Sequence, residues 1–183
     1  MINKYINLIV HFFKYSVAID YNGYYCIIAG VLIAFFVFLY LLFCRKLSLV
    51  KCSIISIIMI YMGVLFAATI VSRQSMENRT IVLTPFWSLQ ELSNGKKGYL
   101  TEILVNIMMF VPLGILIQIL NKKITHTVLI CLLISAGIEC LQFFFQKGIC
   151  ELDDCVYNIC GALVGALIGV FVDRVYGRWH EAI

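Results

Sequence analysis

Acidic and amide residues recur at helical spacing inside otherwise apolar stretches of this sequence. Glu139 and Gln142 stand three residues apart, and a helix places residues with that spacing on one face. A charged side chain costs about 2.5–3.5 kcal/mol at the centre of a membrane-spanning helix, so Glu139 is a candidate functional group. Gln142 has a purely structural alternative, because it can join two helices by a hydrogen bond worth about 0.6 kcal/mol.

A second polar set begins at Glu151 and continues through Asp154 and Asn158. Their spacing of three and then four residues lines one face as a helix begins, where acids also complement the helix dipole. Adjacent residues point in different directions, so we expect Asp153 to lie in solvent. Asn158 has the same structural alternative as Gln142.

A third set combines polar residues with residues that change the backbone. Glu102 and Asn106 stand four apart and share a helix face. Pro112 removes a backbone donor and Gly114 adds freedom, so a kink is predicted there. Small residues in the last apolar stretch predict a seam for close packing against another helix. The seam consists of Gly161, Gly165 and Gly169.

These polar groups lie toward the same face of the predicted membrane, and we expect them to share one cleft. The candidate cleft residues are Asn106, Glu139, Gln142, Glu151, Asp154 and Asn158. Gathered carboxylates suit a divalent cation, a basic headgroup or proton transfer, and the sequence does not choose among them. No cofactor is identified, and the three histidines, His11, His126 and His180, are scattered.

The composition requires a lipid environment. Hydrophobic residues make up 62% of the chain, charged residues only 13%, and the mean hydropathy is +0.97, which is more apolar surface than a soluble domain of 183 residues can bury. We predict an all-α bundle of about five spans, since about 20 apolar residues cross the hydrocarbon core. The predicted spans are 24–44, 52–71, 101–120, 124–145 and 155–175.

The ends of the chain differ from this bundle. Residues 1–20 combine an apolar stripe with polar interruptions, which predicts a helix lying flat at the interface. We divide the chain into residues 1–49, with this helix and one additional span, residues 50–176 as a four-helix transmembrane domain, and a cytoplasmic tail at 177–183. Most of the eight cysteines are interpreted as small buried hydrophobes, with a Cys150–Cys155 disulfide as an alternative at an oxidising face.

Basic residues predict the orientation. Seven basic residues fall on each side of the predicted membrane, but those on one side crowd the short connections and the tail, where the positive-inside bias acts. We therefore place the C-terminus in the cytoplasm and loops 72–100 and 146–154 outside. The first of these loops carries Arg73, Arg79 and Trp87, and basic groups beside aromatic rings suit contact with phosphate-bearing headgroups.

Taken in order, these motifs resemble the VanZ family of small membrane proteins over roughly residues 50–176. The segment with Arg79, Pro85 and Phe86 is similar to the family's Arg-x-x-Asn-Leu-x-Pro-Phe motif, with Val82 where asparagine is usual. The next motif of the family is matched by Asn106, Phe110, Pro112 and Gly114.

The two remaining motifs contain the acidic residues. Glu139 and Gln142 fit the family's Glu-x-x-Gln. Its Asp-Ile-x-Asp-x-x-x-Asn-x-x-Gly motif is matched by Glu151, Leu152, Asp154, Asn158 and Gly161, with Glu151 replacing aspartate. The family usually has arginine three residues before that acid, where this chain has Gly148. Lys147 beside it supplies a point charge but no bidentate fork.

The resemblance implies a membrane protein of Gram-positive bacteria that lowers susceptibility to teicoplanin and related lipoglycopeptides. Our leading hypothesis is an envelope protein that alters how glycopeptides or lipid-anchored cell-wall precursors engage the outer leaflet, with membrane lipids and no nucleic acid as partners. The alternative is an intramembrane enzyme that modifies a lipid or lipid-linked headgroup with Glu139 or Asp154 as acid or base. A transporter is less supported, because no inverted repeat is evident.

Overall fold

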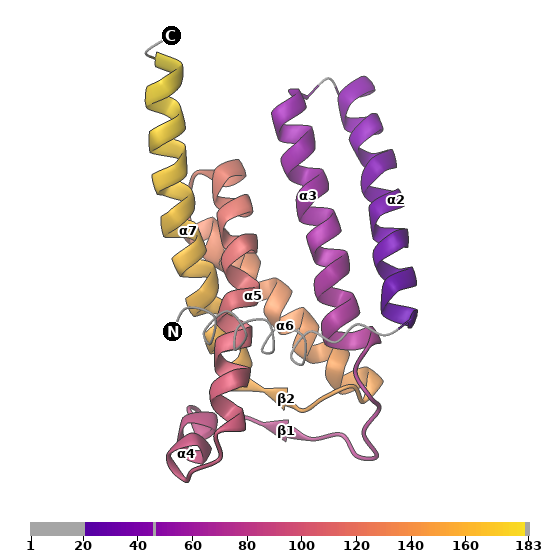
Figure 1. The fold of residues 1–183 in the computed structure, drawn as a ribbon, viewed down its shortest axis with the longest axis vertical. Helices are drawn as coiled ribbons and strands as arrows, with labels where there is room; N and C mark the ends of the chain where they lie inside the picture. The colour runs from indigo at the N-terminus through magenta and orange to yellow at the C-terminus, as the bar shows by residue number, and fades with distance from the viewer. Residues whose placement is uncertain (1–20, 46, 182–183) are drawn as a thin grey trace, which may run out of the picture.

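The computed structural model describes residues 21–45 and 47–181, and Figure 1 shows a bundle of long helices. α2 (Tyr21–Phe43) and α3 (Leu49–Phe66) form an antiparallel hairpin, and α3 continues into a π-helical turn, η1 (Ala67–Val71). The interfacial helix expected over residues 1–20 lies outside the described residues.

Three more long helices complete the bundle. They are α5 (Gly98–Asn121), α6 (Ile124–Phe145) and α7 (Leu152–Glu181). Together with α2 and the α3–η1 segment they make five helices long and apolar enough to cross a membrane, which confirms the predicted all-α, five-span fold class. α7 runs beyond the predicted end at residue 175 and includes most of the predicted tail.

The short elements gather at one end of the bundle, which we call the loop end. β1 (Ile81–Val82) pairs in parallel with β2 (Cys150–Glu151), and α4 (Trp87–Ser93) lies beside them. η1 and α6 finish at this end, and α5 and α7 begin there (Figure 1). The loops around residues 72–97 and 146–151 therefore meet over the ends of four helices.

Local chemistry sets where the helices begin and end. Ser48 caps α3 by accepting a hydrogen bond from the Lys51 backbone N–H at 3.4 Å. Lys122 and Gln146 adopt left-handed backbone angles and terminate α5 and α6. The connection between α5 and α6 is only two residues long, so these two helices run antiparallel.

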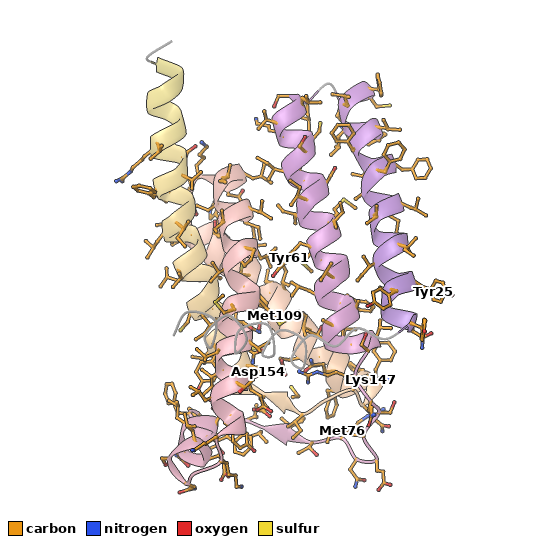
Figure 2. All side chains as sticks on the ribbon, viewed as in Figure 1. Tyr25, Tyr61, Met76, Met109, Lys147 and Asp154 are labelled. Carbon is orange, nitrogen blue, oxygen red and sulfur yellow. The ribbon has the colours of Figure 1, made fainter. Side chains whose placement is uncertain are left out.

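The hydrophobic core lies between α3, α5, α6 and α7. Its buried members include Leu65, Phe110, Leu113 and Cys131. Tyr61 reaches from α3 to α5, where its hydroxyl donates to the Met109 carbonyl at 2.7 Å (Figure 2). α2 packs chiefly on α3 and η1 and exposes most of its large apolar side chains, as a helix facing lipid does.

Glycines let α7 approach α5 closely. A Cβ on Gly161 would collide with the Ile107 carbonyl oxygen, and one on Gly165 with the Val111 carbonyl oxygen. Gly114 of α5 faces Ala162 of α7 in the same way. This contact between backbones holds the middle parts of α5 and α7 side by side. Pro112 lies inside α5, which continues past it to Asn121.

The glycine contact predicts a stability difference between two small substitutions. Gly161→Ala places a methyl group against the Ile107 carbonyl, so we expect a destabilisation of roughly 1–3 kcal/mol. Gly137→Ala on α6 is the matched control, because its Cβ meets nothing within 4 Å. Thermal melting of both variants in detergent measures the effect. Equal melting temperatures would show that the seam is not tightly packed.

Candidate functional site

The candidate site lies inside the loop end, where α5, α6, α7 and η1 each contribute polar side chains. The amide of Asn106 on α5 donates to Asp154 Oδ1 on α7 at 2.6 Å. In Figure 2, Asp154 lies beside the β1–β2 pair, on the side toward Met109. The first turn of α7 and the middle of α5 are therefore joined by a polar contact as well as by the glycine seam.

Glu139 ties α6 to the start of α7. Its side chain is only 4% exposed, and its Oε2 accepts a hydrogen bond from the Glu151 backbone N–H at 3.0 Å. Glu151 belongs to β2, so the carboxylate is held under the strand rather than turned toward lipid. A charged or polar group in this position needs such partners, because lipid offers none.

Two buried amides complete the inner part of the site. Gln142 Nε2 donates to the Thr69 carbonyl of η1 at 3.1 Å, and Asn158 Nδ2 donates to Ser135 Oγ at 2.8 Å. Each side chain is therefore oriented by its NH₂ group. The opposite atoms, Gln142 Oε1 and Asn158 Oδ1, are buried and have no hydrogen-bond partner.

These groups surround a small cavity that we call the inner recess. Its volume is about 30 Å³. That is room for one or two groups the size of a water molecule. Polar lining comes from Thr69, Arg73, Asn106, Glu139, Gln142, Asp154 and Asn158.

A larger hollow, the outer cleft, has a volume of about 570 Å³. It shares Arg73, Val105, Asn106 and Asp154 with the inner recess, so the two spaces adjoin. Its further polar lining consists of Thr101, Glu102 and Glu151. Of the six predicted cleft residues, the structure places five around the inner recess, and Glu151 lines the outer cleft instead.

The positive charge of the site comes from Arg73, just beyond η1. Its Nη1 lies 2.7 Å from the point where a Cβ on Gly148 would stand, so the guanidinium fills the space left by that glycine. Arg73 lines both the recess and the cleft. From the sequence we expect Arg73 only in a loop with other basic residues, and it is not among the predicted cleft residues. Its position directly after an apolar span, at the polar end of the bundle, is the feature that could have indicated its role.

The basic residues predicted to contact headgroups are located elsewhere. Arg79 donates to the Phe144 carbonyl at 3.4 Å and stacks over the Phe143 ring, outside the lining of both spaces. Lys147 donates to the Arg73 carbonyl at 2.8 Å and so supports the segment that carries Arg73 (Figure 2). A direct contact of either residue with an anion stays a prediction.

The expectation that Asp153 is solvated is wrong. Its side chain is 1% exposed and accepts hydrogen bonds from the backbone N–H groups of Phe86 and Ser88 and from Ser88 Oγ, at 2.6–3.0 Å. The carboxylate fastens the start of α4 to α7, because the first N–H groups of a helix lack partners within that helix. A pattern of i, i+3, i+7 residues cannot reveal this contact, whose partner lies 65 residues away.

Glu151, which lines the outer cleft, is held in place by Trp87. The Trp87 indole N–H donates to Glu151 Oε2 at 2.9 Å, and the indole ring meets Tyr99 edge-on. Burial raises the pKa of the Glu151 carboxyl above its usual value. Cys150 beside it is a free thiol, as is Cys155, so the alternative disulfide is not formed.

The site has no ready-made metal centre. Within residues 21–45 and 47–181, no three histidine, cysteine, aspartate or glutamate side chains form a group that could hold a metal ion. A cation at this site would depend on the amide oxygens and on water as well as on carboxylates.

Fold and site together define a multi-pass helical membrane protein with a polar cleft at one end of its bundle. The family model VanZ/LLP1 matches residues 52–173, more than half of the chain, and the protein belongs to this family. The comparison with curated proteins found no match, nor did the comparison with solved structures.

The Asp153 contact predicts which acid fastens the outer loop. Asp153→Ala leaves the half-buried Phe86 N–H and the buried Ser88 N–H without their acceptor, so we expect a destabilisation of about 1–3 kcal/mol and faster proteolysis between residues 83 and 97. Asp173→Ala is the control, because Asp173 makes only a solvent-exposed ion pair with Lys122. Limited proteolysis with peptide mapping tests the pair. Equal cleavage of both variants would contradict the assignment.

Proposed function

We propose that this protein lies in the cell membrane with its loop end outward and lowers susceptibility to teicoplanin and related lipoglycopeptides. It acts by binding a polar headgroup of the outer leaflet in the outer cleft. The observation that carries the proposal is a cleft of about 570 Å³, lined by carboxylates and Arg73, in a chain of the VanZ/LLP1 family. A ligand bound there changes which headgroups a glycopeptide or a cell-wall precursor meets.

Charge supports the proposed orientation. Arg45 and Lys123 lie in short connections at the end of the bundle opposite to the cleft, and Lys51 lies in the first turn of α3 at the same end. Positive residues in such positions favour the cytoplasmic side. The acids Glu102, Glu151 and Asp154 lie at the loop end. With an odd number of spans after residue 20, this orientation puts α7's C-terminal end in the cytoplasm.

A susceptibility assay tests the function. In a strain whose teicoplanin protection depends on this gene, we expect Glu139→Ala and Asp154→Asn to lose most of the protection, because they remove carboxyl groups from the inner recess and, for Asp154, from the outer cleft as well. Asp173→Asn, which changes an acid at the opposite end, should keep it. Immunoblots of membranes establish equal protein levels. Full protection by both cleft variants at wild-type levels would remove the cleft from the mechanism.

An intramembrane enzyme is the second candidate. Two carboxyl groups, on Glu139 and Asp154, line the same recess, and a pair of this kind can serve as acid and base. Modification of a lipid or lipid-linked headgroup would then consume the ligand. Lipid mass spectra of cells with wild-type protein and with Glu139→Gln distinguish the two candidates. A lipid product present only with the wild type supports the enzyme, and identical spectra contradict it.

A further inference from the structure

The atoms that face the inner recess are mostly hydrogen-bond acceptors. Gln142 and Asn158 are 2% and 5% exposed, and each directs an unpartnered carbonyl oxygen away from the group that fixes its NH₂. Reversing Gln142 would set its oxygen against the Thr69 carbonyl, which cannot donate. The carboxylates of Glu139 and Asp154 line the same space. Apart from the Arg73 guanidinium, the recess therefore presents mainly acceptor oxygens, including those of two carboxyl groups.

A primary ammonium group matches this lining. It has three N–H donors, no acceptor and one positive charge. The volume of about 30 Å³ admits a group about as large as a water molecule, whereas three methyl groups on the nitrogen would exceed it. A buried acceptor without a partner is costly, so a ligand that donates hydrogen bonds to these oxygens gains affinity.

Arg73 indicates what the ammonium is attached to. Its guanidinium lines both the recess and the outer cleft. Among the described residues it makes no direct ion pair, but it interacts electrostatically with the carboxyl groups of Glu102, Glu139, Glu151 and Asp154. A guanidinium pairs most strongly with a phosphate or carboxylate. A bare cation in the recess would be repelled by this charge, while a ligand with both charges satisfies both ends of the site.

We propose that the site binds an aminoalkyl phosphate, with its primary ammonium in the inner recess and its phosphate against Arg73 in the outer cleft. This inference rests on the proposed function and names the headgroup that the site takes. The membrane source of this chemistry is a phosphoethanolamine headgroup, and the soluble source is free phosphoethanolamine.

Lipid binding tests the proposal on the full chain. Native mass spectrometry of the purified protein in detergent compares phosphatidylethanolamine with phosphatidylcholine carrying identical acyl chains. We expect phosphatidylethanolamine to bind about tenfold more tightly or better, because only its nitrogen donates hydrogen bonds and fits the recess. Equal affinities would overturn the proposal and leave the recess as a water site.

Two variants test the binding of the ammonium and of the phosphate separately. Glu139→Gln keeps an acceptor for the Glu151 N–H but removes the charge, so it should abolish the preference for the primary amine. Arg73→Gln should weaken both lipids by about tenfold, because both carry the phosphate. Arg79→Gln is the matched control and should change neither, since Arg79 lies outside the cleft lining. An unchanged preference in Glu139→Gln would contradict the proposal.

Competition identifies the source of the ligand. Soluble phosphoethanolamine that displaces the lipid shows that the headgroup alone carries binding. A lack of displacement, with the lipid preference intact, shows that the membrane form is the ligand. Both results support the same chemistry. Binding of Mg²⁺ that Glu139→Gln abolishes, without any preference between the lipids, would replace the proposal with a cation site.

The proposed ligand and the proposed function can fail separately. If phosphatidylethanolamine preference is found but Glu139→Ala and Asp154→Asn cells keep full teicoplanin protection, the ligand stands and the proposed function falls. If those cells lose protection but the lipids bind equally, the cleft is needed and the ligand class is wrong.

Discussion

The structure depends on one constraint, which is that polar groups inside a membrane bundle need partners from the protein itself. Asn106 with Asp154, Glu139 with the Glu151 N–H, and Gln142 with the Thr69 carbonyl meet this need in turn. These bonds link η1, α5, α6 and the start of α7. The carbonyl oxygens of Gln142 and Asn158 stay unpaired beside one small recess, and these acceptors favour a ligand that donates hydrogen bonds.

Two structural features produce this arrangement, namely the glycine contacts of α7 and the π-helical turn η1. Glycines on α7 bring its backbone against α5, which places Asp154 within reach of Asn106. The π-helical turn at the end of α3 carries Thr69 and leads directly to Arg73, and π-helical segments often mark functional sites. The Asp153 and Glu151 contacts then hold α4, with Trp87 and Ser88, against the start of α7 and β2. Stability and site formation therefore use neighbouring residues of α7.

Much of the fold follows from hydropathy, because span length and apolar composition are local properties of the sequence. The range 124–145 predicted for α6 matches its bounds, and the other spans begin three residues early in the structure. The site is harder to predict, since spacing gives the face of one helix but not its neighbour. Asp153 and Arg73 are two residues whose roles the spacing could not predict. The partners of Asp153 are backbone groups of a distant loop, and Arg73 reaches the cleft because position 148 has no side chain.

Water access to the cleft is the central claim, and cysteine labelling tests it most directly. In a background without the eight native cysteines, Asn106→Cys faces the cleft, whereas Leu104→Cys stands at nearly the same depth of α5 on a face that is 43% exposed outside the bundle. A small, membrane-impermeant thiosulfonate should react with Asn106→Cys and not with Leu104→Cys, because lipid suppresses the reactive thiolate. Faster labelling at position 104 than at 106 would contradict the account.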